Sequence, residues 1–249
     1  MTKIYNFDPI TKEYTGSENA YEDPAATKRT GHFVPIVPAN ATTKKPPKTK
    51  TNETAIYTNN EWEIVDDFRG LYKVNYLMQP EKVTELGALP EGYAPATEAQ
   101  AQQIQSDKLY YVVQDGALIK NPNYDEQKLA EVKAEKYNEA LTKAKSFIDN
   151  DAVYRFDENN TIEATDGNIG KLTAYALGFT TGTLETVEWT SKEDNVITLD
   201  QEDLLRVLTG LGIIQSNVWN VQFIAYKQAI ENAVTVEEVR SIEVNYVNE

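Results

Sequence analysis

Apolar and polar residues alternate in short runs over the first 78 residues of the chain, a pattern typical of half-buried β-strands. The run KIYNFDP at residues 3–9 ends in a turn signal and is followed by KEYTGS at residues 12–17, which predicts a small hairpin. The run AIYTNNEWEIVDDFRG at residues 55–70 predicts a second hairpin around Asn59-Asn60, because asparagine tolerates positive φ in a tight turn.

The segment between these hairpins contains prolines that interrupt any central strand. Pro35 and Pro38 each lack the N–H that a sheet ladder requires, so we expect an edge strand or an extended polyproline-like arm here. The Pro- and Lys-rich residues 42–54 predict a flexible or polyproline linker. Beyond the second hairpin, LYKVNYL at residues 71–77 alternates again and predicts a third strand.

A second pattern begins at residue 79, where turn residues mix with a short helical tract. The Asp115-Gly116 pair predicts a hairpin between residues 109–114 and 117–120. Residues 125–149 give the strongest helical periodicity in the chain. This stripe can pack on the protein's own core or form a dimeric or trimeric seam, and it comprises Leu129, Val132, Tyr137, Leu141, Ala144 and Ile148.

The last hundred residues alternate short strands with helices. A hairpin is predicted through Asn159-Asn160, and a modest helix in DGNIGKLTAYALGF at residues 166–179. Another hairpin is predicted around residues 192–195, and the side chains available for its cross-strand contacts are Val187, Trp189, Val196 and Thr198.

Helix caps organise the end of the chain. Asp200 is a candidate N-cap with Asp203 three residues later, and Thr235 with Glu238 forms a candidate capping box for a short final helix. The glycines at 210 and 212 predict a bend or break in the helix that begins after Asp200.

Together these elements predict an α+β fold class. The expected parts are an N-terminal β-rich module with an extended Pro-rich arm at residues 1–78 (linker 42–54), a small middle module with a β-hairpin at 79–124, an amphipathic connecting helix at 125–150, and a C-terminal α+β domain with helices at 151–249.

Composition narrows the range of functions. Hydrophobic residues make up 41% of the 249 residues, enough for folded cores, and the absence of cysteine excludes disulfides, thiolate metal sites and cysteine nucleophiles. No apolar run approaches the roughly 18 residues of a membrane span, and the first residues lack a signal-peptide pattern.

Residues 79–249 carry 14 Lys/Arg and 29 Asp/Glu, and hold the whole net charge of −15. Such an acidic surface repels phosphate backbones, so we expect no nucleic-acid partner.

Candidate catalytic chemistry is sparse. His32 is the only histidine, which excludes histidine-based triads and two-histidine metal sites. Asp66 and Asp67 beside Arg69 could imitate an acid/base set, but adjacent strand residues point apart and an ion pair is the simpler interpretation. Residues 157–168 have a calcium-like composition, yet the EF-hand register requires Gly and Glu where Ile162 and Asn168 stand. We therefore predict no enzyme and no cofactor.

The N-terminal motifs carry a family resemblance. The pattern IYNFDPITKEYTGS, then VPANAT, then a Pro-Pro pair, then AIYTNNEWEIVDDFRGLY resembles the N-terminal region of tailed-bacteriophage tail-fibre assembly and tail-fibre-associated proteins. From about residue 125 onward, with RFD, VEWTSKEDNVITLD and YKQAIENAVTVEEVRSI, the chain is similar to a small phage domain of unknown function found in tail-fibre loci. The resemblance covers roughly 1–75 and 125–249.

The resemblance implies a non-enzymatic protein of the virion tail, made in the host cytoplasm. It could be a structural adaptor or tip bound to tail-fibre or baseplate proteins, with a homo-oligomer through the 125–149 helix. Alternatives are an assembly chaperone that is not retained in the virion, and a host-recognition module that binds surface glycans through exposed aromatic residues. The candidate partner-binding residues are Phe33, Pro35, Pro38, Tyr57, Trp62 and Arg69.

Overall fold

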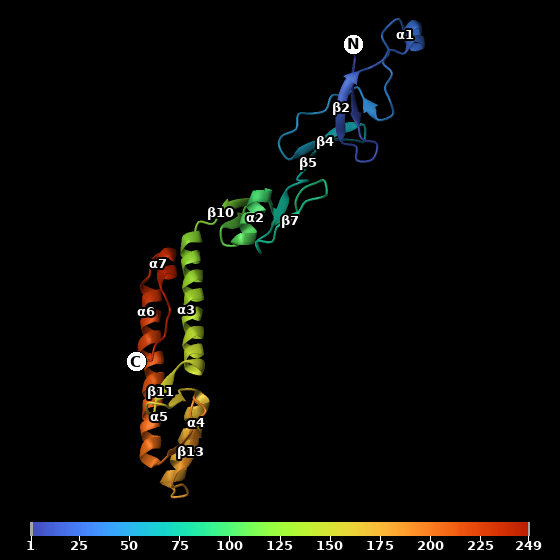
Figure 1. Ribbon diagram of the computed structural model, residues 1–249. Coiled ribbons are helices and arrows are strands. Elements are labelled where there is room, and N and C mark those ends of the chain that lie inside the picture. Colours follow the sequence, from blue (N-terminus) through green and yellow to red (C-terminus); the bar gives the residue numbers. More distant parts are fainter. Residues whose placement is uncertain (1, 249) are drawn as a thin grey trace. The chain divides into compact units, whose positions relative to one another are not determined.

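The computed structural model describes residues 2–248 and divides into two compact units, Met1–Tyr124 and Asp125–Glu249. Each unit combines helices with small antiparallel sheets, so the α+β class predicted from the sequence is confirmed (Figure 1). The units are described separately.

The first unit is mainly β. Its elements are β1 (Lys3–Phe7), β2 (Tyr14–Asn19), α1 (Pro24–Thr30), β3 (Ala41–Thr42), β4 (Glu53–Thr58), β5 (Glu61–Asp66), β6 (Tyr72–Val74), β7 (Glu81–Lys82), β8 (Ala94–Ala96), α2 (Glu98–Ser106), β9 (Tyr111–Gln114) and β10 (Ala117–Lys120).

Both predicted N-terminal hairpins are present. β1 pairs with β2 on one side and with β3 on the other, and β4 pairs with β5 across the two-residue turn Asn59-Asn60. Both asparagines have positive φ, 49° and 66°, as a tight hairpin turn requires. The short strand β3 is an edge strand of this sheet, whereas Pro35 and Pro38, for which an edge strand or an extended arm was predicted, lie outside the strands.

Two segments of this unit differ from the prediction. Helix α1 was not predicted, although Asp23 caps it by accepting hydrogen bonds from the backbone N–H groups of residues 25 and 26, Pro24 opens it and Gly31 closes it at φ 72°. That order of Asp, Pro and Gly is a recognised helix signature. The predicted linker 42–54 is shorter than expected, because Thr42 lies in β3 and β4 begins at Glu53.

A separate three-stranded sheet forms where a module boundary was predicted. β6 pairs with β7 and with β8, so the boundary expected between residues 78 and 79 falls inside one sheet. The strand predicted over 71–77 ends at Val74, because a turn follows in which the Met78 N–H donates to the Asn75 carbonyl. The core between this sheet and α2 includes Val74, Met78, Ala96 and Ile104. The predicted Asp115-Gly116 hairpin follows as β9 and β10.

The second unit is mainly α. Its elements are α3 (Tyr124–Asn150), β11 (Val153–Arg155), β12 (Thr161–Glu163), α4 (Asp166–Thr180), β13 (Val187–Thr190), β14 (Val196–Leu199), α5 (Gln201–Ser216), the π-helix η1 (Asn217–Gln222), α6 (Phe223–Asn232) and α7 (Val236–Ser241).

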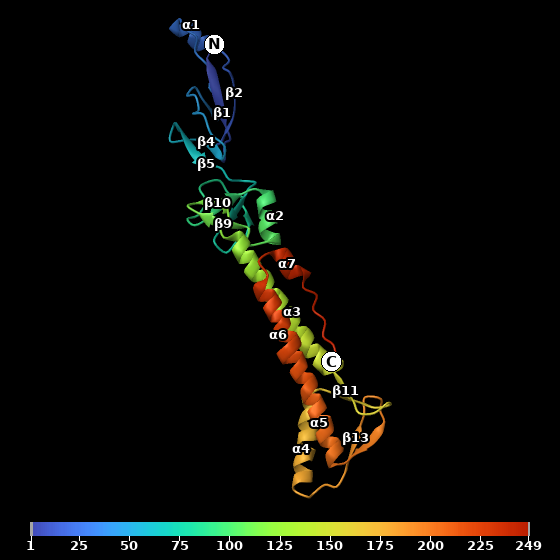
Figure 2. The same cartoon turned by 90° about the vertical axis from the view of Figure 1, so that its left-hand side faces the viewer.

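The long helix α3 is packed within its own unit. It lies beside α6 in both views (Figures 1 and 2), and its buried residues Ala140, Ala144 and Ile148 share a core with residues of η1, α6 and the segment 242–246. Val132 packs nearer its start against α7. The structure therefore shows the intramolecular alternative for the buried residues of this stripe, and the alternative of a seam between copies stays a prediction.

The segment after α7 runs in extended form along this core. Val244 and Tyr246 are buried, and the Tyr246 hydroxyl donates to the Ala140 carbonyl at 3.0 Å. The Gln222 side chain bonds both the N–H and the C=O of Val247, at 3.0 and 2.8 Å. Side chains of the helices thus supply partners for the backbone of this segment.

The prediction of a bend at the glycines in α5 is wrong. The helix runs unbroken from Gln201 to Ser216 and continues through η1 into α6, so the irregular turn lies after it. Gly210 has a packing role instead: a Cβ at this position would overlap the ring of Tyr154, which packs against the helix. The predicted caps of α5 and α7, Asp200 and Thr235, are confirmed.

The predicted contacts of the β13–β14 hairpin are also wrong. Trp189 lies opposite Ile197 and Val187 opposite Leu199, whereas Val196 is exposed. The loop comprises the five residues 191–195, whereas the four residues 192–195 were expected. The pairing of β13 with β14 is therefore shifted by one residue. A one-residue shift places the other set of side chains on the buried face.

Within residues 2–248, none of the helices combines the length and apolar character that a bilayer crossing needs.

Candidate functional site

Four aromatic rings gather where the two N-terminal hairpins meet. Phe7 stacks on Tyr57 with ring centroids 4.9 Å apart, and Trp62 contacts Tyr57 at 5.1 Å and Tyr14 at 5.7 Å. Tyr57 and Trp62 are directly opposed across the β4–β5 ladder, which brings their side chains together on one face. We call these four residues the aromatic cluster; it joins β1 and β2 to the β4–β5 hairpin.

The indole of Trp62 also fixes the start of the Lys-rich segment. Its Nε1–H donates to the Lys44 carbonyl at 2.8 Å, and the Lys44 ammonium donates to the Asn60 carbonyl at 2.7 Å. The chain after β3 is thereby attached to the tip of the β4–β5 hairpin. Trp62 is half-buried, and its indole N–H is hydrogen-bonded within the first unit.

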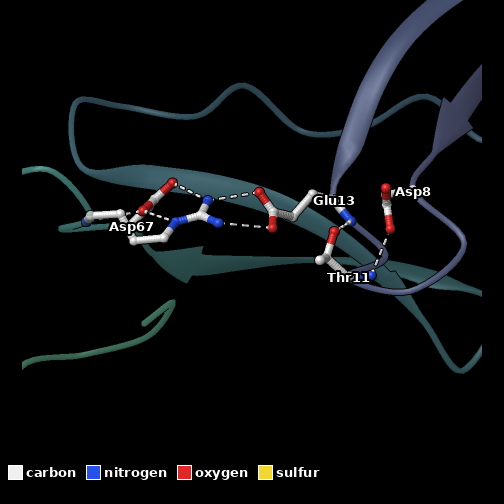
Figure 3. A network of polar contacts seen from close by, with 5 residues as sticks. Asp8, Thr11, Glu13 and Asp67 are labelled. Atoms are coloured by element: carbon white, nitrogen blue, oxygen red, sulfur yellow. Dashed lines mark hydrogen bonds and ion pairs between the residues drawn. The ribbon is translucent and has the colours of Figure 1, made fainter. Parts of the chain in front are cut away.

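A second cluster, built around Arg69, is purely ionic (Figure 3). The guanidinium donates to both carboxylate oxygens of Asp67, at 2.8 and 2.7 Å, and to both of Glu13, at 3.1 and 2.7 Å. Such paired geometry is the strongest that arginine forms with carboxylates. The network connects the β1–β2 turn to the segment after β5, which is 56 residues later in the chain.

The turn that presents Glu13 is shaped by Asp8, which also appears in Figure 3. The Asp8 carboxylate accepts hydrogen bonds from the backbone N–H groups of Thr11 and Ile10, both at 2.8 Å. These bonds hold the pKa of Asp8 below its usual value. The aspartate of the FDP motif therefore forms a turn.

The Arg69 hydrogen bonds likewise lower the pKa of Asp67 from its ordinary 3.8. A carboxylate with a depressed pKa is held in its charged form, which suits an ion pair and opposes a role as a proton donor near neutral pH. Asp66 lies next in the chain, outside this network, and its backbone carbonyl accepts from the Gly87 N–H. The ion pair expected from the sequence between Arg69 and one aspartate is thus present, with Glu13 as an additional partner.

We expect Arg69→Gln to lower the free energy of unfolding of the first unit by about 1 kcal/mol at pH 7, since the exposed third of the side chain weakens the pair through solvent screening. The depressed pKa of Asp67 contributes stability above pH 3.8, and this contribution disappears as the pH falls through the folded-state value. The difference between wild type and variant should therefore shrink in acid. Urea denaturation at pH 7 and pH 3 measures this difference.

The control for that prediction is Glu81→Gln, which changes a largely exposed side chain in the same unit and removes its single 3.2 Å ion pair with Lys73, leaving the contact of Lys73 with the Tyr93 ring in place. It should cost less than about 0.5 kcal/mol at either pH. Equal losses for Arg69→Gln at both pH values would contradict the ionic role of Arg69.

The proline-flanked arm, residues 32–38, forms a surface of a different kind. Its backbone is held by α1 and by the segment between β2 and α1. The Asp23 N–H donates to the Val34 carbonyl, the Ile36 N–H donates to the Tyr21 carbonyl, and the Val34 N–H donates to the Thr27 hydroxyl. Its apolar side chains nevertheless face solvent, with Phe33 43% and Ile36 48% exposed. We call Tyr21, Phe33, Ile36 and Val37 the arm patch.

The structure distributes the six predicted site residues over three places. Phe33, Pro35 and Pro38 lie in the arm, Tyr57 and Trp62 lie in the aromatic cluster, and Arg69 lies in the ionic network. The other exposed residues of the arm patch, Tyr21, Ile36 and Val37, were not predicted from the sequence. For Ile36 and Val37 the signal was available, because apolar residues between prolines in an extended arm have no ladder to bury them.

Acidic residues of the calcium-like segment 157–168, and Glu193 in the β13–β14 loop, bind neighbouring backbone and side-chain groups. The Asp157 carboxylate accepts from the Asn159 N–H and the Asn160 amide, and Glu193 accepts two bonds from Thr161 that lower its pKa to about 2. Across the part of the chain that the structure describes, no group of three or more His, Asp or Glu side chains is placed to hold a metal ion.

Comparison of the chain with protein-family models, curated protein sequences and solved structures gave no match. The resemblance to tail-fibre-associated proteins therefore stays a prediction.

Proposed function

We propose that the chain is a non-enzymatic, tail-fibre-associated protein of a tailed bacteriophage that acts as a structural adaptor or tip by binding fibre or baseplate proteins. The observation that carries the proposal is the arm patch. Its backbone is fixed by hydrogen bonds while its apolar side chains remain exposed, which is the arrangement of a preorganised binding surface.

The motifs that carry the resemblance support the same proposal. Asp8 shapes the turn of the FDP motif, and Arg69 of the Arg-Gly motif binds Glu13 in that same turn. Residues that are far apart in the sequence thus meet in one scaffold within the first unit. The hydrogen-bonding groups of these side chains stabilise the fold, since the Arg69 guanidinium donates to the carboxylates of both Asp67 and Glu13.

The test uses an arm-patch variant and a matched control. We expect Phe33→Asp combined with Ile36→Asp to lower incorporation into virions by about 10-fold or more, since charges in the centre of an apolar interface leave buried groups unpaired. The control, Ile10→Asp, changes an apolar side chain that is also exposed but lies in the β1–β2 turn. Incorporation is measured by quantitative mass spectrometry of purified particles, after melting curves establish that each variant is folded.

Equal incorporation of the arm-patch variant and wild type would contradict the proposed use of the arm. An assembly chaperone, the second candidate, would instead be abundant in infected cells and missing from purified virions. A glycan-binding module is favoured by one observation, the 79% exposure of the Tyr21 and Tyr76 side chains, because exposed rings can stack on sugars.

A further inference from the structure

The second unit contains an apolar groove between α4 and α5. Its volume is about 590 Å³, and the buried Leu204 forms its floor. Leu177 and Leu205 on its two sides are 66% and 51% exposed, so the groove is open to solvent. The face of α4 that lines it is otherwise made of small residues, Gly170, Thr173, Ala174, Ala176 and Thr180.

The two threonine hydroxyls of this lining are already satisfied, and Gln201 is its remaining polar side chain. The Thr173 hydroxyl donates to the Ile169 carbonyl at 2.7 Å and the Thr180 hydroxyl donates to the Ala176 carbonyl at 2.9 Å. The hydroxyls of both threonines are therefore bound within α4 itself. An occupant gains contact with apolar surface here and finds few hydrogen-bond partners for a bare backbone.

One end of the groove is acidic. Leu205 and Gln201 also line an adjoining depression whose other residues include Glu185, Asp200 and Glu202. The Asp200 carboxylate caps α5, whereas Glu185 and Glu202 form no ion pair among residues 2–248. The unit as a whole holds 11 Lys/Arg against 23 Asp/Glu, so the field around this rim is negative.

We propose that the α4–α5 groove binds a basic amphipathic helix of a partner protein. Apolar side chains one turn apart on that helix would contact Leu177 and Leu205, and its Lys or Arg residues would face the Glu185–Glu202 rim. A helix fits better than an extended strand, because a helix satisfies its own backbone groups and the groove offers no free sheet edge. The inference concerns the second unit and does not depend on the role of the arm patch.

The test measures the binding of two synthetic peptides to the full chain by fluorescence anisotropy. Both peptides carry the same leucines at helical spacing, and they differ in having either lysines or glutamates on the flanks. We expect the basic peptide to bind in the micromolar range and the acidic peptide to bind at least about 10-fold more weakly.

Two protein variants separate groove binding from general electrostatic attraction. Leu205→Asp places a negative charge inside the groove, and Ile213→Asp places the same charge on an exposed position of the same helix outside it. We expect Leu205→Asp to lower the affinity for the basic peptide by about 10-fold, and Ile213→Asp to change that affinity by less than about 2-fold. Since both variants make the protein more acidic, purely electrostatic binding would be equal or tighter in each.

Three results would overturn the proposal: no binding of the basic peptide at millimolar concentration, equal binding of both peptides, or identical effects of the two substitutions. A dimer of the chain, seen by sedimentation without peptide and dissociated by Leu205→Asp, would also overturn it, because a second copy would then be the occupant.

Discussion

Trp62→Ala is expected to lower the free energy of unfolding of the first unit by about 2–3 kcal/mol. A fully buried aromatic residue loses roughly 3–5 kcal/mol on truncation, and the half-buried position of Trp62 reduces that loss. The substitution removes three ring contacts, with Phe7, Tyr14 and Tyr57, and the indole hydrogen bond to the Lys44 carbonyl. It therefore loosens both the joint between the hairpins and the attachment of the Lys-rich segment.

Hydrogen exchange of peptides from residues 3–66 during urea denaturation reports this unit without requiring tryptophan fluorescence. Trp62→Phe serves as the control, because it keeps a ring in the aromatic cluster and removes the indole donor, at a cost of about 1 kcal/mol. Unchanged protection in Trp62→Ala would show that the cluster does not hold the hairpins together.

Two neighbouring glycines of α5 are expected to respond in opposite directions to the same substitution. Gly210→Ala should lower the free energy of unfolding of the second unit by about 1–3 kcal/mol, because the added Cβ overlaps the Tyr154 ring. Gly212→Ala should raise it by about 0.5–1 kcal/mol, because no atom lies within 4 Å of the new methyl group and alanine favours the helix.

This pair is measured by urea denaturation in a Trp62→Phe background, where the fluorescence of Trp189 and Trp219 reports the second unit alone. Each variant is the control for the other, since the helix and the substitution are the same. Stabilisation by Gly210→Ala would contradict the packing of Tyr154 against this glycine, and destabilisation by Gly212→Ala would contradict the continuous helix.

The sequence was most informative where structure is encoded locally. The Asn59-Asn60 and Asp115-Gly116 turns, the capping residues Asp200 and Thr235, and the stripe of α3 each depend on residues within a few positions of one another, and all are confirmed. Turn chemistry and helical periodicity act over that range. Helix α1 had the same kind of signal in its Asp-Pro start and Gly end, and could have been found.

Features that depend on distant partners, or on the exact length of a loop, could not be predicted. Gly210 looks like a helix breaker until the ring of Tyr154, from a strand 56 residues earlier, is placed against it. The register of β13 and β14 depends on whether the loop holds four or five residues, which composition does not determine. The candidate site shows the same limit: an ion pair for Arg69 was expected, but Glu13 in the first hairpin was not.

Preorganisation is the physical basis of the proposed adaptor role. The aromatic cluster and the Arg69 network fix the two hairpins, and hydrogen bonds from Asp23, Val34 and Ile36 fix the arm before any partner binds. A partner then gains contact with the arm patch without the cost of ordering it.

Quantitative mass spectrometry of virions, from the tailed phage that we propose encodes this chain, tests the central claim most directly. The proposed role as a bound fibre or baseplate component predicts a copy number of about three, six or a small multiple of these per particle, because such assemblies are symmetric. Absence from purified virions, with the protein abundant in infected cells, would contradict it and indicate an assembly factor.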